Sequence, residues 1–363
     1  MAKRVHVDPW LFATTIVLVF IGLVMVFSAS AVTAGELYGS PYTFVFKQFI
    51  FATLGLIALW ALMHIDYHKL DKPAIVFPLI GLTSLLLVLV LFLDRSHNTH
   101  RWLKFAGLSF QPSELAKLAL VVFMAQFLST RAKSMADARN TMLPAIAPCV
   151  VFCALIAAQP DLGTAMMCLA ITGSILFVAG MPFRWFAFAT LPLAPVLYYL
   201  IVLTPWRWKR MTVFMDPFSD AHGTGFQTIQ SLIAVGTGGV TGQGLMEGKQ
   251  KLFYLPEPHN DFIFAVTAEE LGLVGSIFIV TLFAVFCWRG IRAAMKAPDP
   301  FGRFLATGIT AMVGVQAFFN ISVVLALLPT KGIPLPFMSY GGSSILLMLA
   351  GVGILLNVSR QAE

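Results

Sequence analysis

One carboxylate closes a polar segment directly before a long apolar run. Leu255-Pro256-Glu257-Pro258-His259-Asn260-Asp261 leads into an apolar stretch that begins at Phe262. At such a place burial raises the pKa of a carboxyl group, whereas the helix dipole lowers it. Asp261 is therefore a candidate general base that activates a hydroxyl group, or alternatively a helix N-cap. Glu257 and His259 are its candidate partners, or else solvated loop residues.

Basic residues gather in the loops and helix ends that fall on the same predicted side as Asp261. They are Lys47, Arg101, Lys117, Arg207, Arg210 and Lys331. One base and several cations suit an anionic, membrane-tethered substrate, because the base activates a hydroxyl while the cations stabilise a departing diphosphate.

Four of these basic residues have a plainer interpretation. Trp206-Arg207-Trp208-Lys209-Arg210 is also typical of a segment that anchors a helix end at the membrane interface. Glu114 and Lys117 stand three residues apart and could neutralise each other. Lys47 has no carboxylate one turn further on, so it either extends its ammonium group to the interface or pairs with another helix.

Segments rich in proline and glycine predict irregular backbone on this side. Pro329, Pro334 and Pro336 precede Ser339-Tyr340-Gly341-Gly342-Ser343-Ser344. Irregular backbone at membrane depth is tolerated only where protein or a cavity shields it, so this segment predicts a pocket wall. The glycines of 236–248 are a weak candidate for an anion-binding nest, and flexible, re-entrant packing is an equal alternative. Residues 227–235 predict a helix in the interface.

Composition shows which elements must position these residues. Of the 363 residues, 58% are hydrophobic and only 11% are charged, whereas ordinary soluble domains carry about 25% charged residues. A soluble globule and a disordered chain are both excluded, and the sequence predicts one all-α polytopic membrane domain over 1–363. Ten stretches are long enough to be transmembrane helices: about 10–34, 42–65, 73–93, 112–128, 142–158, 163–180, 185–204, 262–288, 304–328 and 340–357.

Lysine and arginine in the connecting segments predict the orientation. With an inside N-terminus, the inner segments hold 13 of them in 54 residues and the outer segments hold 9 in 97, so we expect both termini in the cytoplasm. The stretch 10–34 is too long for a signal peptide and reads as an uncleaved first helix. One large extracellular loop, 205–261, then joins the seventh and eighth helices.

The net charge of +7 reports this orientation and not nucleic-acid binding, because no Lys/Arg-rich run is present. All of the cysteines (Cys149, Cys153, Cys168 and Cys287) fall in apolar stretches, which excludes a secreted disulfide framework. No cluster has dedicated metal-ligand spacing. A divalent cation, Mg²⁺ or Mn²⁺, is nevertheless conceivable beside a pyrophosphate leaving group.

Several blocks, spread in order over nearly the whole chain, resemble one family. They are Arg101-Trp102 with Gln111-Pro112-Ser113-Glu114-Leu115-Ala116-Lys117, Gln159-Pro160-Asp161-Leu162-Gly163-Thr164, Tyr254 to Ala265, Glu269-Glu270-Leu271-Gly272, and Pro329-Thr330-Lys331-Gly332 with Ser339 to Ser344. The chain resembles the SEDS (shape, elongation, division and sporulation) proteins of the FtsW and RodA type. Asn260 and Ala268 depart from the residues common there (Thr and Gly), but neither change removes an ionisable group. Phe253-Tyr254 is more similar to the division-type, FtsW-like members.

The resemblance implies a ten-helix peptidoglycan glycosyltransferase of the bacterial cytoplasmic (inner) membrane that polymerises lipid II on the outer face. It implies that Asp261 deprotonates the GlcNAc 4-hydroxyl, which attacks the MurNAc anomeric carbon with inversion, forming a β-1,4 bond and releasing undecaprenyl pyrophosphate. It also implies a class B penicillin-binding protein, a transpeptidase, as a partner beside the eighth and ninth helices, together with other divisome or elongasome proteins and membrane lipids.

Two alternatives from other functional classes remain open. Buried charges in a ten-helix bundle also suit a lipid II flippase or transporter, and the chain could serve as a non-catalytic scaffold. Irregular segments gathered on one face argue against alternating access. We therefore expect Asp261 to be catalytic and a larger set to bind substrate: Lys47, Arg101, Trp102, Gln111, Ser113, Glu114, Lys117, Arg207, Arg210, Glu257, His259, Lys331, Ser339, Tyr340 and Ser343.

Overall fold

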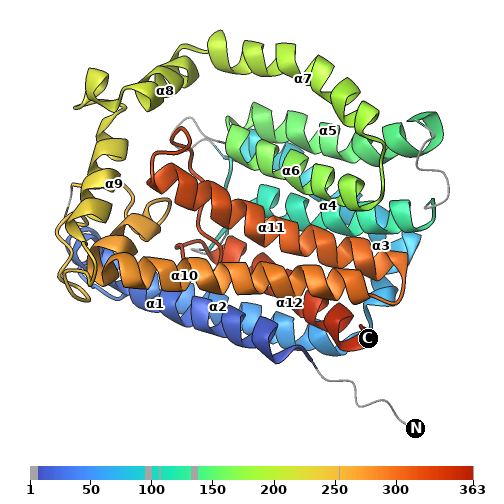
Figure 1. Ribbon diagram of the computed structural model, residues 1–363, viewed down its shortest axis with the longest axis horizontal. Coiled ribbons are helices and arrows are strands. Elements are labelled where there is room, and N and C mark those ends of the chain that lie inside the picture. Colours follow the sequence, from blue (N-terminus) through green and yellow to red (C-terminus); the bar gives the residue numbers. More distant parts are fainter. Residues whose placement is uncertain (1–6, 95–99, 106–107, 132–137, 253, 363) are drawn as a thin grey trace.

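The computed structural model describes residues 7–94, 100–105, 108–131, 138–252 and 254–362. The interpretation of Phe253 as a division-type feature therefore lies outside the described residues. Long helices run side by side along one axis (Figure 1). They are α1 (Pro9–Tyr38), α2 (Thr43–His64), α3 (Pro73–Leu93), α4 (Pro112–Ser129), α5 (Leu143–Ala158), α6 (Leu162–Val178), α7 (Phe183–Val202), α10 (Ile263–Lys296), α11 (Pro300–Val324) and α12 (Gly342–Gln361).

Among the described residues, eight helical segments are long and apolar enough to cross a membrane, and the chain is a multi-pass membrane protein. They are α1, α2, α3, α4, the segment Asn140–Ala158 around α5, α10, α11 and α12. The helix α6 is apolar but shorter, at 17 residues. Local sequence sets several of the ends. At α1, for example, the Asp8 carboxylate accepts hydrogen bonds from the backbone of Trp10 and Leu11, and Gly39 ends the helix in the left-handed conformation.

Each predicted apolar stretch overlaps one of the long helices, but some bounds differ. The stretch 304–328 corresponds to α11, which begins four residues earlier because the Asp299 side chain caps it and Pro300 occupies its first turn. The stretch 262–288 corresponds to α10, which continues to Lys296. The first helix begins and the last helix ends at the same end of the bundle (Figure 1).

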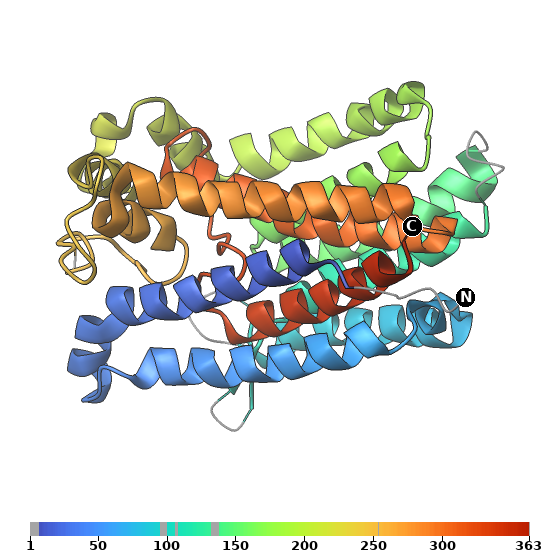
Figure 2. The same cartoon turned by 60° about the horizontal axis from the view of Figure 1, so that its bottom comes forward.

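The bundle is densest around α4, α11 and α12, whose inward faces are almost completely buried. Helix α2 packs along α12, where Gly353 meets the backbone of Leu59 so closely that a β-carbon would lie 2.6 Å from the Leu59 carbonyl oxygen. The views of Figures 1 and 2 agree that α7 lies away from this core, and its main packing partner is α8 (Pro205–Met215).

The segment 205–261 has more regular structure than the sequence suggested. Besides the expected helix, which is α9 (Phe226–Thr237), it contains α8 and a short 3₁₀ helix, η4 (Pro217–Asp220). Trp206 to Arg210 therefore begin a helix of their own. A further difference from the all-α prediction is a small antiparallel hairpin of β1 (Leu103–Phe105) and β2 (Leu108–Phe110), which pairs Leu103 with Phe110. Both strands alternate apolar and polar residues.

The glycine-rich stretch packs against a kink in α10. At Gly272 the backbone leaves the helical region (φ 65°, ψ −163°), and the amides of Gln243 and Gly244 donate to the carbonyls of Glu269 and Glu270. A β-carbon on Gly242 would lie 2.1 Å from the Glu270 oxygen, so only glycine permits this approach.

Carboxylates of the chain itself accept hydrogen bonds from backbone amides at the end of this stretch and directly after it. Glu269 accepts from the backbone of Lys249 and Gln250, and Glu270 accepts from that of Met246. Lys251 and Ser28 complete the cluster, 2.6 Å from the Glu270 carboxylate. These amides therefore bind the Glu269 and Glu270 carboxylates, and the glycines allow the stretch to pack closely against α10.

Candidate functional site

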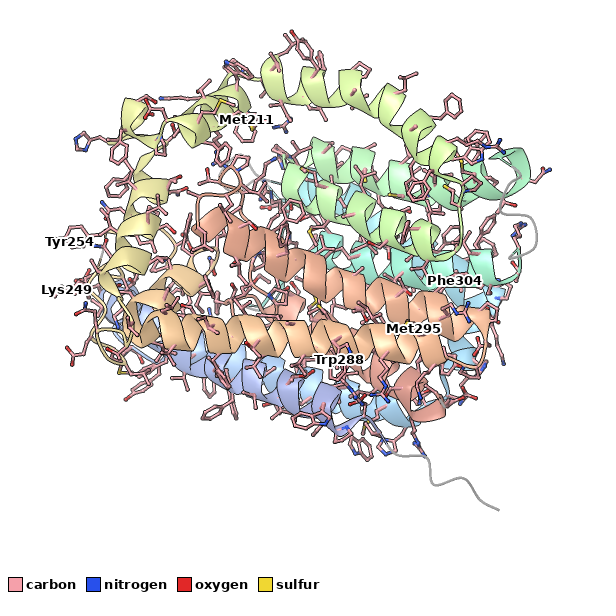
Figure 3. All side chains as sticks on the ribbon, in the orientation of Figure 1. Met211, Lys249, Tyr254, Trp288, Met295 and Phe304 are labelled. Carbon is pink, nitrogen blue, oxygen red and sulfur yellow. The ribbon has the colours of Figure 1, made fainter. Side chains whose placement is uncertain are left out.

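A polar cavity of about 640 Å³ opens at the end of the bundle where α6 and α10 begin. Met211 of α8 lines it and marks its place in Figure 3. Its charged lining residues are Arg101, Asp161, Arg207, Arg210, Glu257, Asp261 and Lys331. A larger cavity of about 930 Å³ lies between α6, α10 and α11, but its walls are mostly apolar. The smaller cavity is therefore the candidate site, because its lining carries the groups that can take part in acid–base chemistry.

Asp261 lies in this cavity, just before α10. Phe262 occupies the cap position of that helix, and no side-chain hydrogen bond caps it. Within the described residues the Asp261 carboxylate accepts no hydrogen bond and forms no ion pair, so the N-cap interpretation is not supported. Burial, followed by the charges of Glu257 and Asp161, raises the pKa of Asp261 to about 7 against the opposing effect of Arg101 and Arg210. A carboxylate with this pKa suits a general base near neutral pH.

Consecutive backbone carbonyls hold the Asp261 segment in place. The oxygen of His259 accepts from the Tyr340 amide at 2.9 Å, that of Asn260 from the Ser339 hydroxyl at 2.6 Å, and that of Asp261 from the Asn320 side-chain amide at 2.7 Å. Pro329 to Gly332, at the start of the proline-rich segment, line the cavity and form one of its walls.

Gly332 of this wall lies against the Asp261 carboxylate. A β-carbon at Gly332 would stand 2.9 Å from Asp261 Oδ2. The absence of a side chain at this position therefore leaves room for the carboxylate.

Four cations line the cavity without a carboxylate partner. None of Arg101, Arg207, Arg210 and Lys331 forms an ion pair within the described residues. Arg101 is held by the carbonyls of Gln159 (3.2 Å from Nε) and Pro160. Burial, and then the positive charges of Arg207 and Arg210, lowers the pKa of Lys331 to about 8. An anionic ligand would relieve this excess of positive charge.

The indole ring of Trp206 forms cation–π contacts with two of these cations. The guanidinium of Arg207 lies 4.9 Å from the ring centroid and that of Arg210 lies 5.4 Å from it. The Arg207 side chain also donates to the Leu200 carbonyl at 3.0 Å. Trp206 itself is 47% exposed and lines the cavity, so the aromatic and basic cluster supports the site as well as a helix end.

Glu114 and Lys117 lie inside the bundle and do not line the cavity. They form a buried ion pair at 2.8 Å, which is the arrangement of the self-neutralising alternative. Lys117 also donates to Gln316 Oε1 at 2.7 Å, and Gln316 Nε2 donates to the Pro334 carbonyl at 2.8 Å. The pair therefore supports the proline-rich wall through Gln316. Ser113 is buried beside it in sequence, and its hydroxyl has no partner among the described residues.

The N-terminal ends of α4 and α12 meet behind the site. The amide of Gln111 donates to the Ser343 hydroxyl at 3.2 Å, and its side chain approaches Asp161 Oδ2 at 3.5 Å. The Trp102 amide donates to Asp94 at 3.0 Å. Trp102, Gln111 and Ser343 do not line the cavity. They stabilise the backbone next to it.

The last predicted residues are divided between the site and its surroundings. His259 is buried between Phe44 (ring centroids 4.6 Å apart) and Tyr340 (5.6 Å), and burial lowers the pKa of its imidazole. Glu257 is exposed, lines the cavity and accepts from the Asn260 side chain at 2.7 Å. Lys47 lies outside the cavity, with its ammonium 6.0 Å from the Tyr38 ring centroid.

Sequence reasoning missed Asp161 and Asn320 as site residues. In the sequence Asp161 stands only within the block from Gln159 to Thr164 that resembles the family, and in the structure its carboxylate caps α6 by accepting from the Thr164 amide. Asn320 is an amide within an apolar helix, a position that by default indicates function. Within the described residues, no group of three or more His, Cys, Asp or Glu side chains could hold a metal ion.

Comparison with known proteins gives one consistent family. Residues 9–363 match the family model for FtsW, RodA and SpoVE, described as cell cycle proteins. The chain is 44% identical to stage V sporulation protein E of Bacillus subtilis (strain 168) over 99% of both chains. It is also 44% identical to the probable peptidoglycan glycosyltransferase FtsW of Geobacter sp. (strain M18) over 95% of both.

Solved structures agree over the same length. A chain from a peptidoglycan synthase complex, studied for its coordination of polymerisation and crosslinking, superposes with a TM-score of 0.79 at 30% identity and 98% coverage of both chains. The rod shape determining protein RodA of Thermus thermophilus superposes with a TM-score of 0.70 at 28% identity, covering 98% of this chain and 97% of that one.

Proposed function

Since this chain belongs to the FtsW, RodA and SpoVE family and is a peptidoglycan glycosyltransferase, we propose that it polymerises lipid II in the polar cavity, with Asp261 as the base. The observation that carries the proposal is a cavity in which the Asp261 carboxylate and the four cations that line it form no ion pair with any described residue. The relatives' names supply the reaction class, and the cavity supplies the residues.

The proposed reaction is an inverting displacement. Asp261 accepts the proton of the GlcNAc 4-hydroxyl, and that oxygen attacks the anomeric carbon of MurNAc in a second substrate. The bond from this carbon to the phosphate oxygen breaks, a β-1,4 bond forms, and undecaprenyl pyrophosphate departs. Arg101, Arg207, Arg210 and Lys331 stabilise the charge that develops on the diphosphate.

We propose that the cavity opens on the outer face of the bacterial cytoplasmic membrane. This orientation follows from the lysine and arginine bias, which puts both termini inside and 205–261 outside. In this orientation α1 to α7 and α10 to α12 cross the membrane ten times as one domain over 1–363. Helices α8 and α9 then lie in the outer segment.

A class B penicillin-binding protein is the proposed partner. The similarity to a chain of a peptidoglycan synthase complex supports a crosslinking partner. The exposed apolar side chains of α10, among them Val274, Phe278 and Trp288, offer a surface for its membrane helix beside α10 and α11. Other divisome or elongasome proteins and the surrounding lipids would contact the remaining surface.

A divalent cation fits this site only together with the substrate. The carboxylates lining the cavity are Asp161, Glu257 and Asp261, and Asp161 already accepts two hydrogen bonds from Thr164. Mg²⁺ commonly binds through one or two carboxylates plus substrate phosphates. A diphosphate-bound Mg²⁺ or Mn²⁺ near Asp261 is therefore compatible with the proposal.

Gel analysis of glycan products from purified protein with lipid II and the partner tests this function. Asp216→Asn is the matched control, because Asp216 is an exposed carboxylate of the same segment that lies outside the cavity. We expect polymer from the wild type and from Asp216→Asn, and none from Asp261→Asn. Normal glycan chains from Asp261→Asn would refute the base, and translocation of lipid II without polymer would favour the flippase alternative.

A further inference from the structure

Asn320 bridges the two backbone segments that carry the chemistry. It lies on α11, its side chain is 1% exposed, and its Nδ2 donates to the carbonyl of Asp261 at 2.7 Å and to that of Ile333 at 2.8 Å. Both partners are acceptors, so the amide nitrogen and not the oxygen must face them. One side chain thus connects residue 261 to the segment that contains Lys331 and Gly332.

Burial of the Asn320 side chain is energetically unfavourable. The Asn320 Oδ1 atom is buried and has no partner among the described residues. Burying an unsatisfied amide oxygen destabilises the folded protein, and a leucine of similar size would avoid this loss. An apolar residue would therefore suit the packing of α11 better, and the two hydrogen bonds must account for the amide.

The consequence of the bridge is a fixed distance between Asp261 and the opposite wall. The Asp261 carboxylate lies so close to Gly332 that a β-carbon there would stand 2.9 Å from Oδ2, and Lys331 is the neighbouring residue. We propose that Asn320 is a positioning residue for the glycosyl transfer: by holding the carbonyls of Asp261 and Ile333 it sets the base against the cationic wall. This inference rests on the proposed role of Asp261.

The same helix offers a matched control. Gln316 stands one turn before Asn320, is also buried, and its Nε2 donates to the Pro334 carbonyl at 2.8 Å. It therefore holds the same wall without a bond to Asp261. Replacing either amide by leucine leaves a wall carbonyl unpaired. Gln316→Leu also removes an acceptor of Lys117, which keeps its ion pair with Glu114, but only Asn320→Leu releases the base.

The experiment compares wild type, Asn320→Leu and Gln316→Leu as full-length protein with the partner. Initial rates of lipid II polymerisation are measured over substrate concentration and pH, and thermal unfolding midpoints are recorded for each variant. For Asn320→Leu we expect kcat to fall about 10- to 100-fold, as a base displaced by about 1 Å would cause, with KM changed less than about twofold.

The pH profile separates positioning from a structural role. Release of Asp261 toward solvent lowers its pKa, so the acid limb of the Asn320→Leu profile moves to lower pH, whereas that of Gln316→Leu stays at the wild-type position. If Asn320→Leu does not fold, Asn320→Ala, which removes the same two hydrogen bonds with a smaller side chain, is expected to show the same fall in kcat and the same shift of the acid limb.

Two results would overturn the inference. One is wild-type kcat in Asn320→Leu, and the other is an equal loss and an equal pH shift in Gln316→Leu, which would assign Asn320 to the wall alone. Failure of the proposed function is distinguishable from both, because it would appear as absent polymer from the wild type or as full activity of Asp261→Asn.

Discussion

The pH dependence of glycan polymerisation follows from two groups in the cavity. Asp261 must be ionised to accept a proton, and its pKa is raised to about 7. Roughly one tenth of the molecules then carry the active base at pH 6 and roughly nine tenths at pH 8. Lys331 must keep its proton to stabilise the leaving diphosphate, and its pKa is lowered to about 8. We expect kcat/KM to be bell-shaped with its maximum between these two values, as macroscopic constants of the coupled site.

Separate substitutions move the two limbs. Glu257→Gln removes a negative charge that raises the pKa of Asp261, so the acid limb moves to lower pH. Glu257 is exposed, and such a charge is worth at most about 1 kcal/mol, which corresponds to a shift of at most about 0.7 pH unit. Lys331→Arg keeps the positive charge at every accessible pH, so the alkaline limb disappears while the acid limb stays.

Initial rates of lipid II polymerisation at low substrate, from about pH 5 to about pH 10, measure kcat/KM for the wild type and both variants. Thermal unfolding at each pH verifies that the protein remains folded. An acid limb that stays in place or moves to higher pH in Glu257→Gln would refute the assignment to Asp261. An alkaline limb that persists near pH 8 in Lys331→Arg would refute the assignment to Lys331.

Three further predictions concern packing and stability. Gly332→Ala puts a β-carbon 2.9 Å from Asp261 Oδ2, so polymerisation in the gel assay should fall about tenfold or more, whereas Gly236→Ala, which meets nothing within 4 Å, should leave it unchanged. Because the folded protein disfavours ionised Asp261, stability is lost as pH rises from about 4 to about 7. Asp261→Asn should therefore raise the free energy of unfolding at pH 8 by up to about 4 kcal/mol, seen as a higher thermal midpoint, and leave it unchanged at pH 4. Lys251→Met removes the cation that lies 2.6 Å from the buried Glu270 carboxylate, and should lower the free energy of unfolding by about 3–5 kcal/mol, measured by thermal unfolding. A second change, Glu270→Gln, should restore part of this stability.

Hydropathy predicted the long helices because length and apolarity are local properties of the chain. The stretch 262–288 located the start of α10 within one residue, since the polar segment ends at Asp261. The same reasoning missed α8, because Trp206 to Arg210 mix aromatic and basic residues and show no apolar run. It also gave no sign of the kink at Gly272, which depends on backbone pairing with residues 239–244.

The sequence also predicted several of the charged residues that line the cavity, for a similar reason. Asp261, Arg207, Arg210 and Lys331 lie in irregular or interfacial segments on one predicted side, and all four line the cavity. Lys117 lies within a helix, where sequence gives its depth but not the face it occupies. Its ammonium lies inside the bundle beside Glu114.

The buried and cavity-lining cations differ in whether a carboxylate partner neutralises them. The buried lysines 117 and 251 each have a carboxylate, at 2.8 and 2.6 Å, whereas Arg101 and Lys331 have none among the described residues and face the cavity. A membrane protein tolerates a buried charge when a partner neutralises it, and an unpaired one persists where a ligand or water can reach it. Asn320 extends the argument to neutral groups: its donors are satisfied by backbone 59 and 13 residues away, a relation that only the folded chain creates. Positioning residues of this kind are therefore found by following hydrogen bonds outward from the base.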